Sequence, residues 1–416
     1  MNKPKLSSGY FLPLVFVSVM FFCIGFSLGI NGLLIPYLKK AFSLSSADSY
    51  LVIAAAFSAF VVFGYPAGLL IQKVGYKRGM SLSFVIFSIG LALFIPSARL
   101  ESFPLFLLAS FVSGAGNTLL QAAVNPYVTI CGPMESAARR ISIMTIINRS
   151  GWAIAPIFLA MFLDISQVTV SLQDMLMPFY IIVGVFMMLG VLAWFAPLPE
   201  IKAKGEENGQ ETEESADLIA FVASKKSILQ FPHLLLGVLT LFFYVGLDTL
   251  IFVTPVDFAS TLGLANPQVY TMHTVYAISV GCILGILLIP KIISQTTALK
   301  VCAILGCVTS LLIVLMPPQI SLHLVSLLGF SSSMVWPAVW PLAISYLGKY
   351  TKVGSSLLVI AVVGGAIIPL LFGWLKDLTS NIQQAYWILL PSFLIITFYA
   401  FKGHKIGLKA VNLLRN

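Results

Sequence analysis

Twelve long apolar runs recur along this chain, and they restrict its fold more than any other sequence feature. Each run has about 18 to 27 residues, which is long enough for a helix to cross a hydrocarbon core of roughly 30 Å. Because 59% of the residues are hydrophobic and only 9% are charged, the chain has too little polar surface to cover a soluble globule. We therefore predict an all-α membrane protein with 12 transmembrane helices.

The apolar runs fall into two sets of six, which are separated by the longest polar stretch of the sequence. The first six predicted spans cover residues 11–38, 50–72, 80–98, 103–130, 141–163 and 176–197. The second six cover residues 233–257, 268–290, 298–317, 320–347, 354–375 and 385–402. These spans predict an N-terminal six-helix bundle over residues 1–199, a cytoplasmic linker over 200–230 and a C-terminal six-helix bundle over 231–416. We expect the linker to be a solvated tether.

The basic residues are concentrated in short connections between the apolar runs, and they give the chain a net charge of +9. If the N-terminus is cytoplasmic, 19 of the 24 Lys and Arg residues fall in inner segments, four in outer connections, and Arg149 inside a span. An excess of this size predicts that both termini are cytoplasmic. The same excess accounts for the positive charge without a nucleic-acid partner.

Short segments of the two halves resemble each other at a nearly constant offset. Gly68-Leu-Leu-Ile-Gln-Lys-Val lies 217 residues before Gly285-Ile-Leu-Leu-Ile-Pro-Lys-Ile, and Asn125-Pro126 lies 215 residues before Trp340-Pro341. Two such matches favour an internal duplication, which is a common origin of transporter folds. We therefore expect the two bundles to be pseudo-symmetric.

Several polar and aromatic side chains are expected to lie inside the membrane. Asn117, Gln121 and Asn125 are spaced four residues apart, so they share one face of a helix. Amide groups both donate and accept hydrogen bonds, which suits the hydroxyl groups of a sugar, although they could equally join neighbouring helices. Trp336 and Trp340 lie one helical turn apart, and each precedes a proline that could interrupt the helix. Their rings could stack on a sugar or serve only in packing.

Asp248 is the acidic residue that we place well inside a predicted span, and Arg149 is the corresponding basic residue. A charge at this depth is costly and needs a partner or a function. Asp248 could therefore carry a coupled proton. It could also form a fixed ion pair with Arg149, which would leave transport uncoupled.

The connection between the second and third spans resembles a signature of the major facilitator superfamily, Gly-x-x-x-Asp-x-x-Gly-x-Lys/Arg. Gly68, Gly75, Lys77 and Arg78 fit this pattern, whereas Gln72 stands where the family has an acidic residue. We expect this connection to act as the gating loop of that family. The replacement by Gln72 removes the carboxylate on which the latch of the family depends.

Within this superfamily the chain is similar to the fucose permease type of sugar:proton symporters. The matching segments are Ile30-Asn31-Gly32, Gln121 to Val128, Asn148 with Gly151, Tyr244-Val245-Gly246, and Gly354-Ser355-Ser356 with Gly364-Gly365. The resemblance and the patterns above give these candidate substrate-binding residues: Asn31, Asn117, Gln121, Asn125, Thr145, Asn148, Tyr244, Trp336 and Trp340.

Proton coupling in the fucose permease family is attributed to two carboxylates, one in the first span and one in the fourth. At the matching positions this chain has Gly32 and Gln121, and neither can carry a proton. Adding the repeat offset of about 216 to position 32 leads to Asp248. We therefore expect Asp248 to take over the coupling role, with Arg149 as its possible partner.

These observations predict a secondary active transporter that moves a monosaccharide by alternating access, with a proton as the coupled ion. The alternatives are an uncoupled facilitator and a sensor built on the transporter fold. An intramembrane enzyme is disfavoured, because the sequence has no HExxH or GxSxG motif and no second deep aspartate. We expect a monomer in the cytoplasmic membrane that contacts lipid and has no cofactor, metal site or catalytic residue.

Overall fold

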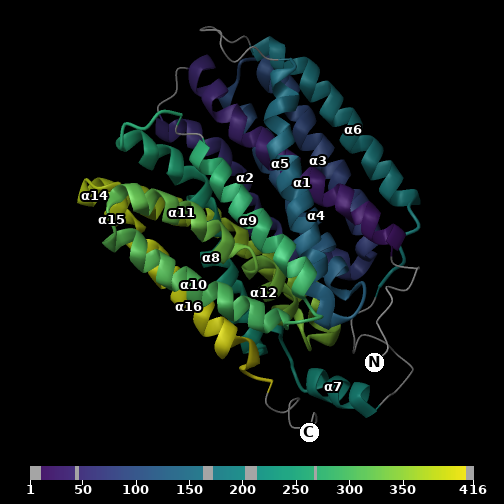
Figure 1. Cartoon of the computed structure of the whole chain (residues 1–416). Helices are drawn as coiled ribbons and strands as arrows, with labels where there is room; N and C mark the ends of the chain where they lie inside the picture. Colours follow the sequence, from purple (N-terminus) through teal and green to yellow (C-terminus); the bar gives the residue numbers. More distant parts are fainter. Residues whose placement is uncertain (1–10, 43–45, 163–171, 202–212, 267–268, 409–416) are drawn as a thin grey trace. The chain divides into compact units, whose positions relative to one another are not determined.

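The computed structural model describes residues 11–42, 46–162, 172–201, 213–266 and 269–408. Twelve of its helical segments are long and apolar enough to cross a membrane, which confirms the predicted number within the described residues. The chain divides into two compact units (Figure 1). Unit 1 comprises Met1–Cys131 and Met144–Ile201, and unit 2 comprises Gly132–Ile143 and Lys202–Asn416.

Unit 1 is built around its fourth span, and the neighbouring helices pack closely against it. Its helices are α1 (Phe11–Ala41), α2 (Ser46–Val74), α3 (Tyr76–Arg99), α4 (Phe103–Ile130), most of α5 (Ala137–Ala160) and α6 (Leu176–Phe195). Helix α4 packs against both α2 and α3, and α3 also packs against α6. Glycines permit this proximity: a Cβ atom on Gly116 would lie 2.6 Å from the main-chain nitrogen of Phe87 on α3.

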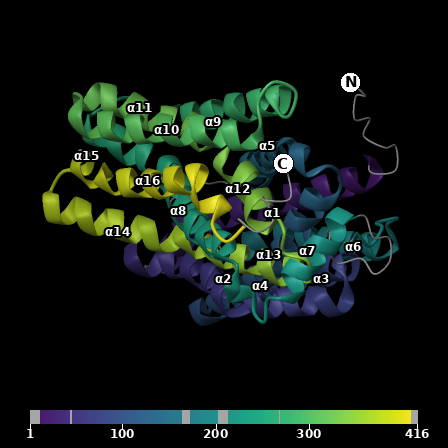
Figure 2. The same cartoon turned by 90° about the horizontal axis from the view of Figure 1, so that it is seen from below.

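Unit 2 holds the remaining spans, and three of them are interrupted. Its helices are α8 (Pro232–Thr261), α9 (Val269–Leu288), α10 (Gln295–Leu315), α11 (Pro318–Ser332), α12 (Val335–Ile344), α13 (Thr351–Ile360), α14 (Gly364–Thr379), α15 (Ile382–Ala385) and α16 (Leu389–Phe401). Helix α8 packs against α12, α14 and α16, while α11 packs against α9 and α10. Figure 2 shows α9, α10 and α11 together along one edge of the unit.

The tenth span is interrupted between α11 and α12, just before Pro337, whereas Pro341, the second proline expected to interrupt it, lies inside α12. Pro337 has no N–H group, so the carbonyl of Ser333, four residues earlier, has no partner within the helix. The thiol of Cys282 on α9 approaches this oxygen, with Sγ 3.8 Å from it. A 3-10 turn, Ala361–Val363, interrupts the eleventh span between α13 and α14, and a second one, Tyr386–Ile388, interrupts the twelfth between α15 and α16.

The connection between the two sets of six spans contains a helix, α7 (Glu213–Ala223), which the sequence did not predict. Leu218 and Val222 on this helix are buried, and the ring of Phe221 meets that of Phe231 at 6.1 Å. Tyr350 also donates a hydrogen bond from its hydroxyl group to the carbonyl of Lys225 (3.0 Å). Part of the expected solvated tether is therefore attached to unit 2.

Candidate substrate and coupling site

Three amide side chains form a hydrogen-bonded ladder along α4. The Nε2 atom of Gln121 donates to Oδ1 of Asn117 (3.0 Å), and Nδ2 of Asn125 donates to the carbonyl of Gln121 (2.9 Å). Asn117, Gln121 and Asn125 are 4%, 7% and 1% exposed. The helical period had predicted that they share a face, and the ladder now also fixes their orientation. The hydrogen bonds thus hold the donors and acceptors of these three amides in fixed orientations in a buried environment.

The ladder retains some unused hydrogen-bonding capacity. Among the described residues, the buried Oδ1 atom of Asn125 has no hydrogen-bond partner. Asn117 lines a cavity of about 20 Å³ together with apolar residues of α1 and α2. This volume has room for one water molecule but not for a sugar. A buried acceptor without a partner is uncommon, and it favours a ligand or a water molecule at that position.

Helix α5 supplies Thr145, Asn148 and Arg149, which the sequence had grouped with the site. All three are half-buried. Asn148 donates from Nδ2 to the carbonyl of Phe21 on α1 (3.0 Å), so this amide joins two helices. Joining neighbouring helices was one of the two roles that the sequence left open for amides inside the membrane; the other was binding a sugar. Asn31, a further candidate on α1, has a side chain outside the described part of the structure.

Tyr244, Trp336 and Trp340 form one aromatic cluster in unit 2. The rings of Trp336 and Trp340 have centroids 5.0 Å apart, and those of Tyr244 and Trp336 are 6.3 Å apart. Trp340 is fully buried, whereas Trp336 retains some exposure. Trp336 is therefore the member best placed to meet a ligand, and the buried ring of Trp340 packs against it.

Asp248 lies near the middle of α8 and is half-buried. Sixteen residues separate it from the start of the helix at Pro232, and 13 from the end at Thr261. At 1.5 Å per residue these separations correspond to roughly 24 Å and 20 Å. Asp248 thus lies near the centre of a helix that is long enough to span the bilayer. It belongs to unit 2 and Arg149 to unit 1, and their pairing stays a prediction.

The predicted gating loop is stabilised by a carboxylate that the sequence analysis did not identify. Gly75 adopts a positive φ of 85° at the start of α3, and this conformation favours glycine. The carboxylate of Glu200, which follows α6, accepts hydrogen bonds from the main-chain nitrogens of Tyr76 (2.8 Å) and Lys77 (3.4 Å). A negative charge at a helix N-terminus is favourable.

Glu200 therefore supplies a carboxylate at the loop in which Gln72 replaces the usual acidic residue. Gln72 is exposed, as is Arg78, whereas Gly68 is buried in α2. The hydroxyl group of Tyr127 donates to the carbonyl of Pro199 (3.1 Å), and this contact fixes the segment that carries Glu200. The position of Glu200 directly after an apolar run was the signal in the sequence that could have suggested a contact with a helix end.

We expect Glu200→Gln to lower the free energy of unfolding by about 1 kcal/mol, since it removes the charge but retains one acceptor. The melting temperature of the purified protein in detergent should then fall by a few degrees. Glu101→Gln is the control, because Glu101 is an exposed residue of the turn after α3. Equal melting temperatures for the two variants would contradict a capping role for Glu200.

Among the described residues, no group of three or more His, Cys, Asp or Glu side chains could hold a metal ion. What the two units offer is a buried amide ladder, an aromatic cluster and one carboxylate deep in a helix. The amides and the aromatic rings each suit the reversible binding of a neutral polar solute, and the carboxylate suits that of a proton.

Comparisons with known proteins agree with this fold. The model of the Major Facilitator Superfamily matches residues 17–369. A glucose/galactose transporter of Brucella abortus is 31% identical over 414 residues, which cover 97% of each chain. The L-fucose-proton symporter of Escherichia coli is 26% identical over 420 residues, which cover 95% of this chain and 93% of the symporter.

A solved structure shows the same arrangement of helices. The crystal structure of FucP, a transporter of the superfamily in the outward conformation, superposes with a TM-score of 0.80 at 24% sequence identity. The match covers 94% of this chain and 98% of FucP. With its twelve apolar helices and its full-length relatives, the chain is an integral, multi-pass membrane protein that belongs to the Major Facilitator Superfamily.

Proposed function

We propose that this protein is a secondary active transporter that moves a monosaccharide across the membrane by alternating access, coupled to a proton. The observation that carries the proposal is similarity along 97% of the chain to a protein named a glucose/galactose transporter. A second relative of nearly the same length is named an L-fucose-proton symporter. The buried polar groups of α4 and α8 give this assignment a physical basis.

The amide ladder of α4 is the proposed binding surface for the hydroxyl groups of the sugar. Asn117, Gln121 and Asn125 carry no net charge, and a neutral ligand needs no counter-charge. The hydrogen bond between Gln121 and Asn117 and that from Asn125 to the main chain of Gln121 hold these side chains in place before the ligand arrives, which reduces the entropy lost on binding. The Oδ1 atom of Asn125 is the acceptor that a hydroxyl group would satisfy.

Asp248 is the proposed proton carrier. It alternates between a protonated and a charged form as the transporter changes its access from one side to the other. A cytoplasm-negative potential drives each positive charge inward by about 2.3 kcal/mol per 100 mV. A fixed ion pair with Arg149 would instead make the protein a facilitator, and the uptake experiment below separates these two functions.

We also propose that the protein is a monomer in the cytoplasmic membrane with both termini in the cytoplasm, and that it has no enzymatic activity. The positive-inside rule supports this orientation, because 19 of the 24 basic residues then lie on the inner side. A cysteine or epitope tag at either end, tested with an impermeant reagent in intact cells, should be inaccessible until the membrane is opened.

Purified protein in liposomes tests the proposed function directly. Labelled D-glucose, D-galactose and L-fucose would be offered with and without an imposed pH gradient and voltage. We expect gradient-driven accumulation of at least one of these sugars, which dissipates when a protonophore is added. Equilibration without accumulation would indicate a facilitator, and no uptake of any sugar would favour a sensor or another solute.

Trp336→Ala should raise the half-saturating sugar concentration about tenfold, since loss of ring stacking costs about 1.4 kcal/mol. Trp336→Phe should restore most of the affinity. Trp340→Ala should instead lower the melting temperature, because this fully buried ring supports the cluster. Concentration-dependent uptake and thermal unfolding distinguish the two effects. An unchanged half-saturating concentration in Trp336→Ala would contradict stacking on the sugar.

A further inference from the structure

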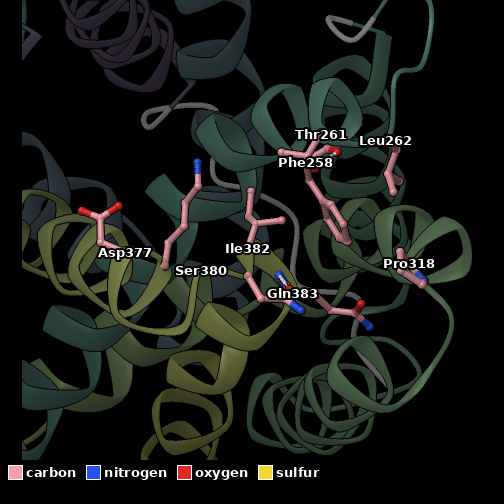
Figure 3. Close-up of a pocket in the computed structure, with 10 residues that line it drawn as sticks. Phe258, Thr261, Leu262, Pro318, Asp377, Ser380, Ile382 and Gln383 are labelled. Atoms are coloured by element: carbon pink, nitrogen blue, oxygen red, sulfur yellow. Dashed lines mark hydrogen bonds between the residues drawn. The ribbon is translucent and has the colours of Figure 1, made fainter.

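A pocket of about 450 Å³ opens at one end of unit 2, and none of its lining residues belongs to the amide ladder or the aromatic cluster. It lies where α8 and α14 end and where α11 and α15 begin (Figure 3). The topology proposed above places this end on the outer side of the membrane. The volume is within the range of small-molecule sites.

One wall of the pocket carries an amide that is held in a single orientation. The Nε2 atom of Gln383 donates to the carbonyls of Ile313 (2.8 Å) and Met316 (2.7 Å), and to Oγ of Ser321 (3.0 Å). The side chain is 8% exposed. Because the donors of Gln383 are engaged, its Oε1 atom is the group left to accept a hydrogen bond in the pocket.

A second amide on the same wall offers a hydrogen-bond donor, whereas Gln383 offers an acceptor. The Oδ1 atom of Asn381 accepts hydrogen bonds from the main-chain nitrogens of Gln383 (2.8 Å) and Gln384 (3.4 Å), and so caps α15. The capping bonds turn the NH₂ group of Asn381 away from the helix. The pocket therefore offers one oriented donor beside one oriented acceptor, which matches neighbouring hydroxyl groups on a sugar ring.

The remaining lining favours a neutral ligand with an apolar face. Phe258, Pro318 and Ile382 supply apolar surface around Gln383 (Figure 3). Lys376 is the basic residue of the lining, and its ammonium group pairs with the carboxylate of Asp257 at 2.6 Å. This pair neutralises the lysine. The remaining charge of the lining, on Asp377, is exposed and screened by solvent, so a charged ligand has little advantage over a neutral one.

We propose that this pocket is a second sugar site, on the outer face of unit 2, which loads substrate before it reaches the membrane-embedded residues. The identity of the ligand rests on the proposed function. The site requires Asn381 as hydrogen-bond donor and Gln383 as acceptor, and neither residue was suggested by the sequence. Its affinity is expected in the millimolar range, because the pocket is open and contributes only a few polar groups.

Protection of a cysteine from chemical labelling tests the proposal. Thr261→Cys places a thiol in the exposed wall of the pocket, and Ala265→Cys places a control thiol in the exposed connection after α8. Four native cysteines are buried and Cys307 is half-buried, so labelling of the parent chain, without an introduced cysteine, gives the background rate. An impermeant maleimide is applied to proteoliposomes with the outer face exposed, with and without D-galactose, D-glucose or L-fucose. Ser380→Cys is the second reporter if Thr261→Cys does not fold.

We expect at least one of the sugars to slow the labelling of Thr261→Cys about fivefold and to leave Ala265→Cys unchanged. Adding Asn381→Asp should abolish the protection, because aspartate still caps α15 but lacks the NH₂ donor. The melting temperature of this double variant should stay within about 2 °C of that of Thr261→Cys, because aspartate retains the cap of α15. This readout separates loss of the donor from loss of the fold.

Protection that persists with Asn381→Asp, equal protection at Ala265→Cys, or no protection by any of the three sugars would overturn the second site. The labelling result does not depend on whether the protein transports sugar. Protection without uptake into the proteoliposomes would support the pocket and count against the proposed function. Uptake without protection would support the proposed function and reject the pocket.

Discussion

Asp248→Asn is expected to abolish accumulation of sugar against a gradient. Asparagine has nearly the same shape as aspartic acid but cannot take up or release a proton, so the coupled ion has no carrier. At 100 mV a coupled charge supplies about 2.3 kcal/mol, which corresponds to a concentration ratio of about 50-fold. The variant should lower this ratio to about 1 and still exchange labelled for unlabelled sugar across the liposome membrane.

The control for this experiment is Asp174→Asn, which changes an exposed carboxylate near the start of α6 in the same way. It should accumulate sugar to the level of the parent protein. Accumulation that is unchanged in Asp248→Asn would reject the coupling role of this residue. A parent protein that equilibrates sugar without accumulating it would instead indicate a facilitator, in which Asp248 and Arg149 form a fixed pair.

The transmembrane helices could be predicted because their signal is local. Each apolar run of about 20 residues must be a helix in lipid, whatever its neighbours are. The interruption of the tenth span also has a local cause, since Pro337 deprives the Ser333 carbonyl of its partner. The helical period likewise put Asn117, Gln121 and Asn125 on one face. The sequence could not show that two of these amides bond to each other.

Contacts between distant parts of the chain were not predictable in this way. Glu200 meets the start of α3 across 124 residues, and no periodic pattern indicates such a pair. The pocket with Asn381 and Gln383 depends on four helix ends that come together from separate spans. Asn148 could be read as a ligand for sugar or as a bond between helices, and only the packing of α1 on α5 showed its contact with Phe21.

Gly25→Val is expected to prevent unit 1 from folding correctly. A Cβ atom at Gly25 would lie 1.8 Å from the carbonyl oxygen of Asn148, and this neighbour is main chain that cannot rotate away. Overpacking of a close helix crossing costs about 3 kcal/mol or more, since α1 and α5 would have to move apart. The variant should give little monodisperse protein in size-exclusion chromatography and a lower melting temperature.

Gly184→Val is the matched control, because it makes the same substitution in α6 where a Cβ atom would meet nothing within 4 Å. It should express and melt like the parent protein. The comparison separates a steric effect at the crossing from the general effect of a β-branched residue in a helix. The crossing also holds Asn148 against Phe21, so folded Gly25→Val protein with normal sugar affinity would show that this hydrogen bond is dispensable for the site.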